Sequence, residues 1–239
     1  MCLNLTFSAV CCIFATVTDL IEEILELRLQ RDPKTRRVVS RRLSLDGRLH
    51  CEDGPAIEEF DGITGHRTRQ EFRMHGDLHA ENGPAMIIWD GVSGKLVEEC
   101  YLKDGSYHRS GGLPAIYRQS PTNGVVAREE YHLNGNAHRV DGPAILFREE
   151  ETGITTQEEW RISDSLHRAT DDPAFTCRDP HTGVVTYEEY CHYGEKHREN
   201  GPAIIERNRQ TGEVFSEEYW RNGQRIVPNQ QGLEEPPPP

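Results

Sequence analysis

The chain repeats itself six times, with a period of 29 or 30 residues. Each repeat holds a Gly, an aromatic residue seven positions later, a turn, a His and usually Gly-Pro-Ala. The prolines of this last motif are Pro55, Pro84, Pro114, Pro143, Pro173 and Pro202. A fixed period in this range indicates a repeat architecture, in which each unit completes its core against its neighbours.

Each repeat contains two short runs that favour β-strands. One run leads to the aromatic residue, as in 183–190, and the other follows Gly-Pro-Ala, as in 144–147. Between them lie dipeptides such as Asn134-Gly135, which supply positive φ at little steric cost. We therefore expect an all-β fold, a single elongated, twisted or curled antiparallel meander of about thirteen strands.

The constant spacing also predicts a register. A hairpin centred on Thr64-Gly65 would place Ile57 opposite Phe72. Repeating this step predicts one apolar row in which aliphatic and aromatic residues pair across strands. The row is Leu43, Ile57, Phe72, Met86, Tyr101, Ile116, Tyr131, Ile145, Trp160, Phe175, Tyr190, Ile204 and Tyr219.

Charged residues fit the same register. It places Arg42 opposite Glu58, Arg41 opposite Glu59, and Glu99 opposite Arg118. Because side chains alternate across a sheet, one glutamate row shares the face of the aromatics and a second row lies on the other face. The first row is Glu99, Glu129, Glu158, Glu188 and Glu217, and the second is Glu71, Glu130, Glu159, Glu189 and Glu218.

The two ends differ from the repeats. Residues 1–31 are expected to form an apolar segment and a capping helix that starts at Asp19, with Glu22 completing a capping box. No Lys or Arg precedes the apolar stretch, so the positively charged start of a signal peptide is missing. Phe7–Val17 is also shorter than the roughly 20 apolar residues that a membrane span needs. Residues 32–227 form the predicted β-repeat domain, and the proline-rich residues 228–239 a disordered tail.

The recurring motif resembles that of the MORN-repeat group and its bacterial MORN-like relatives. Asn134-Gly135-Asn136-Ala137-His138 is similar to the family's Asn-Gly-Lys-x-His turn, and Glu130-Tyr131 to its aromatic strand. The resemblance covers about residues 34–224, although the period is longer and Gly-Pro-Ala replaces Gly-x-Gly. It implies an elongated antiparallel β assembly that serves as a scaffold or binding surface, and some bacterial relatives are antitoxin-like.

Net charge and cysteine content limit the classes of binding partner and the cellular compartment that we expect. The formal charge is −13, which argues against non-specific binding to nucleic acid or anionic membranes. Arg28–Arg48 carries a net +6, so the remainder is still more acidic, and opposite ends of two molecules could associate. Seven irregularly spaced cysteines favour a reducing compartment, so we expect a cytoplasmic protein without integral membrane insertion.

The common catalytic and metal-binding motifs are absent from the sequence. There is no Cys-x-x-Cys, His-Glu-x-x-His, P-loop or Gly-x-Ser-x-Gly pattern. The repeated histidines are expected to hold turns by hydrogen bonding, because equivalent positions lie two strands apart, too far to share a metal ion. These histidines are His50, His79, His108, His138, His167 and His197. We therefore expect the protein not to be an enzyme and to have neither a metal site nor a cofactor.

These observations favour a non-catalytic scaffold that binds a basic or Arg-rich protein through aromatics flanked by glutamates. The predicted contact residues are Phe72, Tyr101, Tyr131, Trp160, Tyr190, Tyr219, Glu99, Glu129, Glu158, Glu188 and Glu217. One alternative is a self-assembling structural protein, a homo-oligomer. Another is a small-molecule binder or enzyme with a pocket at the fifth repeat, where Ser163-Asp164-Ser165 and Asp171-Asp172-Pro173 depart from the pattern.

Overall fold

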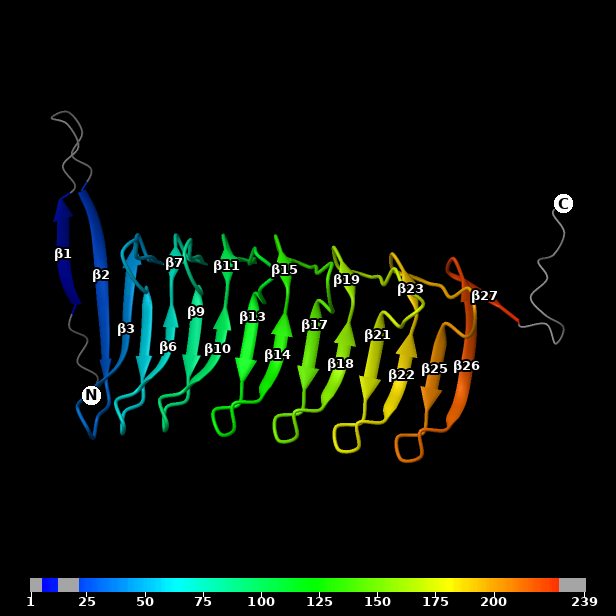
Figure 1. The fold of residues 1–239 in the computed structure, drawn as a ribbon. Coiled ribbons are helices and arrows are strands. Elements are labelled where there is room, and N and C mark those ends of the chain that lie inside the picture. Colours follow the sequence, from blue (N-terminus) through cyan, green and yellow to red (C-terminus); the bar gives the residue numbers. More distant parts are fainter. Residues whose placement is uncertain (1–5, 13–21, 228–239) are drawn as a thin grey trace. The chain divides into compact units, whose positions relative to one another are not determined.

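The computed structural model describes residues 6–12 and 22–227, and this part of the chain is all-β. The chain forms two compact units, unit 1 (Met1–Gly135) and unit 2 (Asn136–Pro239). Each unit is built on strands that pair antiparallel with the next long strand along the chain (Figure 1). The predicted all-β antiparallel meander is therefore confirmed within each unit. No helix among the described residues is long and apolar enough to cross a membrane.

The described residues of unit 1 form fifteen strands. They are β1 (Thr6–Cys12), β2 (Glu22–Arg31), β3 (Val38–Leu45), β4 (Arg48–Leu49), β5 (Ile57–Phe60), β6 (Arg67–Glu71), β7 (Arg73–Met74), β8 (Asp77–Leu78), β9 (Met86–Trp89), β10 (Leu96–Cys100), β11 (Leu102–Lys103), β12 (Ser106–Tyr107), β13 (Ile116–Gln119), β14 (Val126–Glu130) and β15 (His132–Leu133).

Residues 136–227 of unit 2 form twelve further strands. They are β16 (Asn136–Ala137), β17 (Ile145–Arg148), β18 (Thr155–Glu159), β19 (Arg161–Ile162), β20 (Ser165–Leu166), β21 (Phe175–Arg178), β22 (Val185–Glu189), β23 (Cys191–His192), β24 (Glu195–Lys196), β25 (Ile204–Arg207), β26 (Val214–Arg221) and β27 (Gln224–Ile226).

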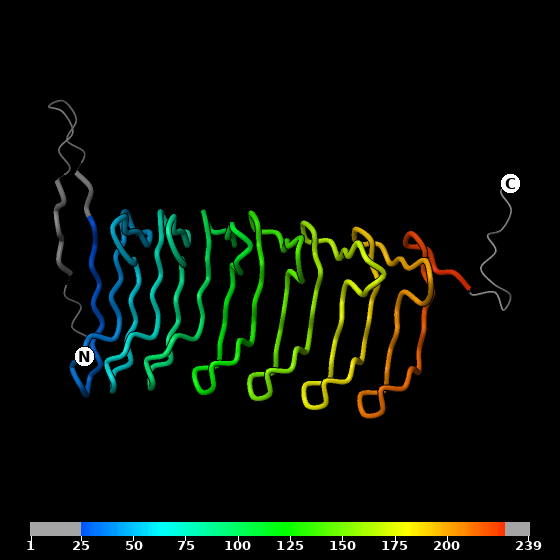
Figure 2. Tube along the Cα trace, in the orientation of Figure 1, coloured from blue at the N-terminus to red at the C-terminus, as the bar shows by residue number. Residues whose placement is uncertain are grey.

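One repeat consists of two sheet strands and a small hairpin. In unit 2, β21 pairs with β22, the chain then makes the β23–β24 hairpin, and β25 returns to pair with β22. Figure 2 shows the tight loops at one end of the sheet strands and the small hairpins at the other. The thirteen strands expected from the sequence correspond to β3, β5, β6, β9, β10, β13, β14, β17, β18, β21, β22, β25 and β26.

The predicted N-terminal helix is wrong where the structure describes it. Residues 22–31 form β2, which pairs with β1 and with β3. The physical reason is a period of two: Leu25, Leu27 and Leu29 are half-buried, whereas the residues between them are exposed. The proposed helix start at Asp19 lies outside the described residues, and so does the tail 228–239.

The predicted register is wrong by one residue. Ile57 lies opposite Glu71 rather than Phe72, and Ile145 lies opposite Glu159. Residues opposite each other in an antiparallel pair share a face. The aliphatic residues after Gly-Pro-Ala therefore share a face with the glutamates, and each aromatic residue follows on the other face.

The shape of the hairpin explains the shift. The loop closes where the Asp61 N–H donates to the His66 carbonyl at 2.9 Å, so its centre lies one residue earlier than predicted. Phe60 pairs with Arg67 but Glu59 pairs with Arg69, which leaves one residue between them unpaired as a β-bulge. The same irregularity recurs in the other hairpins of both units.

The predicted charge pairs shift with the register. Arg41 faces Glu58 and bonds it at 2.7 Å, whereas Arg42 reaches Glu59 diagonally at 3.5 Å. The partner of Arg118 across the strands is likewise Glu98, and Glu99 faces Tyr117 instead.

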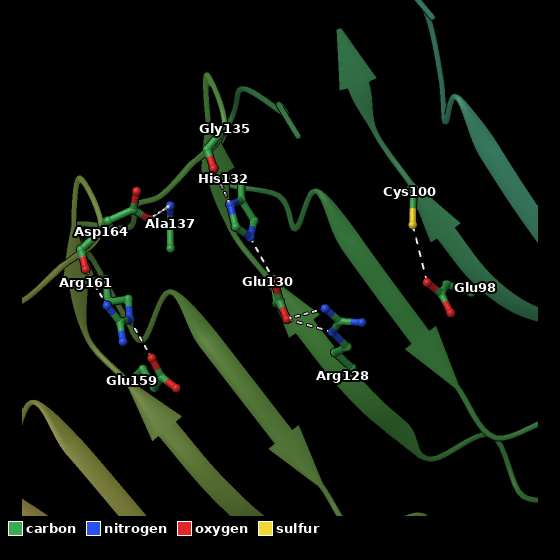
Figure 3. Close-up of polar contacts among 10 residues, drawn as sticks. All are labelled: Glu98, Cys100, Arg128, Glu130, His132, Gly135, Ala137, Glu159, Arg161 and Asp164. Carbon is green, nitrogen blue, oxygen red and sulfur yellow. Dashed lines mark hydrogen bonds and ion pairs between the residues drawn. The ribbon is translucent and has the colours of Figure 1, made fainter. Parts of the chain in front are cut away.

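The small hairpins turn through two residues of positive φ, as in Asn134 (51°) and Gly135 (86°). This is the turn that matches the twist of paired strands. The fifth repeat, whose sequence departs from the pattern, forms the same turn without glycine, since Ser163 and Asp164 have φ of 47° and 68°. The Asp164 carboxylate also accepts the Ala137 N–H at 2.7 Å (Figure 3). This departure in sequence therefore leaves the turn unchanged.

Candidate protein-binding face

In each unit, we call the side of the sheet that carries the aromatic residues the aromatic face. It holds the aromatic residue at or after the end of a long strand and, in most repeats, a glutamate two positions earlier. The Tyr101 hydroxyl donates to Glu99 at 3.4 Å, and the Tyr219 hydroxyl donates to Glu217 at 3.2 Å. These contacts show that both residue types of the predicted site lie on one face.

Arginines of the chain cover several of these aromatic rings. The guanidinium carbon of Arg109 lies 3.6 Å from the centroid of the Tyr101 ring, and that of Arg198 lies 3.7 Å from the Tyr190 ring. Arg168 lies in the same way 4.0 Å from Trp160. Each arginine also donates to the carbonyl of the proline in its own repeat. The aromatic residue therefore belongs to a cation–π stack inside the repeat.

Arginines also bind glutamates of this face. Arg178 bonds Glu158 at 3.0 Å, and Arg207 bonds Glu188 at 2.9 Å. In both cases the arginine comes from the strand that follows the glutamate's strand in the sheet. The glutamates that the sequence analysis assigned to a partner thus hold arginines of the chain itself in these repeats.

Exposure varies along the face. Tyr131 and Tyr190 are buried, at 8% and 7% exposed, whereas Phe72, Tyr101, Trp160 and Tyr219 are half-buried. Among the glutamates of the face, Glu99, Glu129, Glu158 and Glu188 are half-buried, and Glu217 is exposed. Burial and the neighbouring glutamates raise the pKa of Tyr101 and of Tyr190, so both phenols stay protonated.

The opposite side of the sheet, which we call the carboxylate face, carries a feature that sequence reasoning missed. Glu71 is only 1% exposed and forms ion pairs with Arg69 and Arg73. The sequence placed glutamates at this position on the face opposite the aromatics but did not predict their burial. A signal was present in the flanking residues, because Arg two positions before and after Glu71 shares its face.

The same arrangement recurs in other repeats. Glu130 is 2.7 Å from the Arg128 Nε and 2.9 Å from the His132 Nε2 (Figure 3). Burial alone would raise the pKa of Glu130, but the hydrogen bonds from His132 and Arg128 outweigh it and lower that pKa. In the third repeat Cys100 takes the position, fully buried and 3.4 Å from Glu98. Glu71 and Glu130 are thus paired, buried groups that stabilise the sheet.

The six repeated histidines join each small hairpin to the next. The Nδ1 of His138 accepts the N–H of Ser163 at 3.2 Å, and the Nδ1 of His167 accepts that of Tyr193 at 3.3 Å. The other four accept the equivalent N–H at 3.1–3.2 Å. The expectation that these histidines hold turns is confirmed, and Nδ1 must be unprotonated to do so.

This contact makes stability depend on pH. Burial and the neighbouring His192 lower the pKa of His167 from 6.5, so the folded chain keeps this imidazole neutral. The hydrogen bond of His167 contributes its full stabilisation above the pKa that His167 has in the unfolded chain. This stabilisation is lost as the pH falls below that value. We expect a lower urea midpoint at about pH 5.5 than at about pH 7.5, and a smaller difference in His167→Asn. In the control His181→Gln, which alters an exposed loop residue, the wild-type difference should persist; an unchanged difference in His167→Asn would contradict the assignment.

Two buried cysteines of the described residues are held in the protonated form. Burial, with nearby Glu98, raises the pKa of the Cys100 thiol to about 12, and burial with Glu189 does the same for Cys191. Such thiols stay protonated and are poor nucleophiles. No group of three or more potential metal ligands occurs among the described residues.

Two surface hollows, one in each unit, lie at equivalent positions of the repeat. The hollow of unit 1, about 440 Å³, is lined by Phe72, His79 and Pro84. That of unit 2, about 480 Å³, lies at the departing fifth repeat beside Tyr190 and His197. Two acidic residues of the second hollow are paired, Asp171 with Arg198 at 3.1 Å and Asp172 with Arg168 at 3.3 Å. The hollow at the departing repeat thus has a counterpart in unit 1, where the repeat keeps its usual pattern.

No protein-family model, curated protein or solved structure matches the chain. The resemblance to MORN repeats therefore stays a prediction.

Proposed function

We propose that the protein is a non-catalytic repeat scaffold that binds an arginine-bearing segment of another protein on its aromatic face. The observation that carries this proposal is the chemistry of the face itself. Arginines stack on Tyr101 and Tyr190 and pair with Glu158 and Glu188 within the chain. A planar guanidinium suits both contacts, whereas a lysine ammonium makes neither a stack nor a two-pronged ion pair as well.

Several further features support a binding role. The notable contacts recur from repeat to repeat, whereas a catalytic site needs one distinct set of groups. The strongly acidic composition attracts a basic segment and speeds its association. The predicted inhibitor-like or antitoxin-like role belongs to this proposal as one use of such a surface.

Binding of short peptides tests the proposal. At physiological salt, we expect a hexa-arginine peptide to bind more tightly than a hexa-lysine peptide in isothermal titration calorimetry. A Glu99→Gln, Glu129→Gln double variant should weaken arginine binding by about tenfold, because it removes two carboxylates from the face. The matched control, Glu151→Gln with Glu195→Gln, removes the same charge from exposed residues of a loop and of a small hairpin and should leave the affinity unchanged.

Two results would count against the proposal. Equal binding of the arginine and lysine peptides would mean that net charge alone attracts them. Equal losses of affinity in the double variant and in its control would mean that the glutamates of the aromatic face make no specific contribution to binding.

A further inference from the structure

In the inner repeats, the segment that follows a small hairpin runs back beside the sheet strand that precedes the hairpin and pairs with it. In unit 2 this returning segment is Arg198–Arg207. Its first residue, Arg198, stacks on Tyr190 at 3.7 Å. The Tyr190 N–H then donates to the carbonyl of Ala203 in the same segment at 2.8 Å.

The second half of the returning segment binds the glutamates. Ile204 lies opposite Glu189 in the β22–β25 pair. Arg207, three residues further on, forms the 2.9 Å ion pair with Glu188. The previous repeat makes the same four contacts through Arg168, Ala174, Phe175 and Arg178.

The last repeat departs from this pattern. Ile226 and Val227 stand where the inner repeats have His and Arg. Val227 is 86% exposed, so it does not cover Tyr219 as an arginine covers the inner aromatics. Among residues 22–227, no counterpart of the returning segment lies beside β26.

One edge of β26 is only partly paired in the part of the chain that the structure describes. One side of β26 pairs with β25, and the other pairs with β27 only from Tyr219 onward. Within the described residues, 214–218 have no strand on that second side. Glu217 is exposed there, and Phe215 on the same face is 67% exposed. Backbone groups at such an edge can pair with an added strand.

We propose that this edge docks an extended segment of a partner protein that reproduces the returning segment. The segment pairs antiparallel with β26, places an aliphatic residue opposite Glu218, and binds Glu217 with an arginine three residues later. A second arginine, nine residues before that one, stacks on Tyr219, as the spacing of Arg198 and Arg207 dictates. Main-chain hydrogen bonds supply affinity and the side-chain positions supply specificity. This inference rests on the proposed function and names the kind of partner.

Charge distinguishes this occupant from two others. Residues 228–239 contain no Lys or Arg and two Glu, so they cannot supply the arginines. Two copies joined edge to edge through β26 would bring together the carboxylates of Glu217 and Glu218 from both chains, and like charges on paired strands repel. A basic segment of another protein meets neither obstacle.

A synthetic peptide with the sequence of Arg198–Asn208 provides the probe. We expect it to bind the full chain in fluorescence polarisation, and Glu217→Arg to weaken binding by about tenfold or more. A peptide carrying Arg207→Glu should bind wild type weakly and recover affinity toward Glu217→Arg. The control Glu195→Arg, which makes the same charge change on an exposed hairpin residue, should bind like wild type. Circular dichroism would establish that each variant is folded.

The outcomes separate the edge site from the proposed function. Equal affinity of wild type and Glu217→Arg, no binding of the peptide to wild type, or dimerisation through β26 instead would overturn the edge site. If hexa-arginine binding still depends on Glu99 and Glu129, the proposed function survives that failure. If neither peptide binds, both proposals fall.

Discussion

Glu71→Ala should lower the free energy of unfolding by about 3–5 kcal/mol, the loss typical of removing one partner from a buried ion pair. The carboxylate is 1% exposed and joins Arg69 to Arg73, so its removal leaves two guanidinium groups without their counter-charge. Urea denaturation monitored by circular dichroism measures the change, and hydrogen–deuterium exchange of unit 1 locates it.

Glu59 offers a matched control, because its ion pair with Arg42 is 3.5 Å long and largely exposed. Glu59→Ala should cost less than about 1 kcal/mol. If Glu71→Ala costs no more than Glu59→Ala, the buried pairs of the carboxylate face do not stabilise the sheet.

Ile116→Ala should cost about 2–5 kcal/mol, the range for truncating a large aliphatic side chain in a packed core. Ile116 is 2% exposed and packs with Ala85, Cys100 and Leu102 in the hydrophobic cluster of unit 1. A sheet strand bordered by alanines cannot move inward far enough to fill the cavity. The urea midpoint should fall with an unchanged denaturant slope.

An aliphatic residue of a loop tip provides the comparison. Ile63 is 82% exposed, so Ile63→Ala should change the free energy of unfolding by less than about 0.5 kcal/mol. A similar loss in both variants would show that the cluster around Ile116 is not the core of unit 1.

The repeat was predictable because turns and period are local features. Asn134-Gly135 and its equivalents mark the small hairpins, and the constant spacing fixes where strands begin and end. The one-residue error in register arose in the tight loops. A symmetrical hairpin was assumed, whereas the β-bulge near Thr68 adds a residue to one strand, and no local sequence signal marks it.

The N-terminal helix was predicted from a capping box formed by Asp19 and Glu22. The alternation of Leu25, Leu27 and Leu29 supports a strand equally well in so short a stretch. Pairing with β3, which is a tertiary interaction, favours the strand, and propensity alone could not have shown it.

The candidate site was predictable in composition but not in its contacts. The sequence placed Tyr190 and Glu188 on one face, and Tyr–Glu hydrogen bonds elsewhere on that face agree. It did not reveal that Arg198 and Arg207 already occupy them, because the residues involved meet only when the returning segment crosses to the preceding strand. That occupancy identifies Glu217 as the exposed glutamate of the face.

We expect the edge of β26 to hold an arginine-bearing segment in the way that the inner strands hold the returning segment. Hydrogen–deuterium exchange of the full chain with and without the Arg198–Asn208 peptide measures this docking. We predict slower exchange in 214–221 and unchanged exchange in the inner strands, because main-chain pairing protects amides at the edge. Protection confined to other segments, or none at saturating peptide, would contradict docking at this edge.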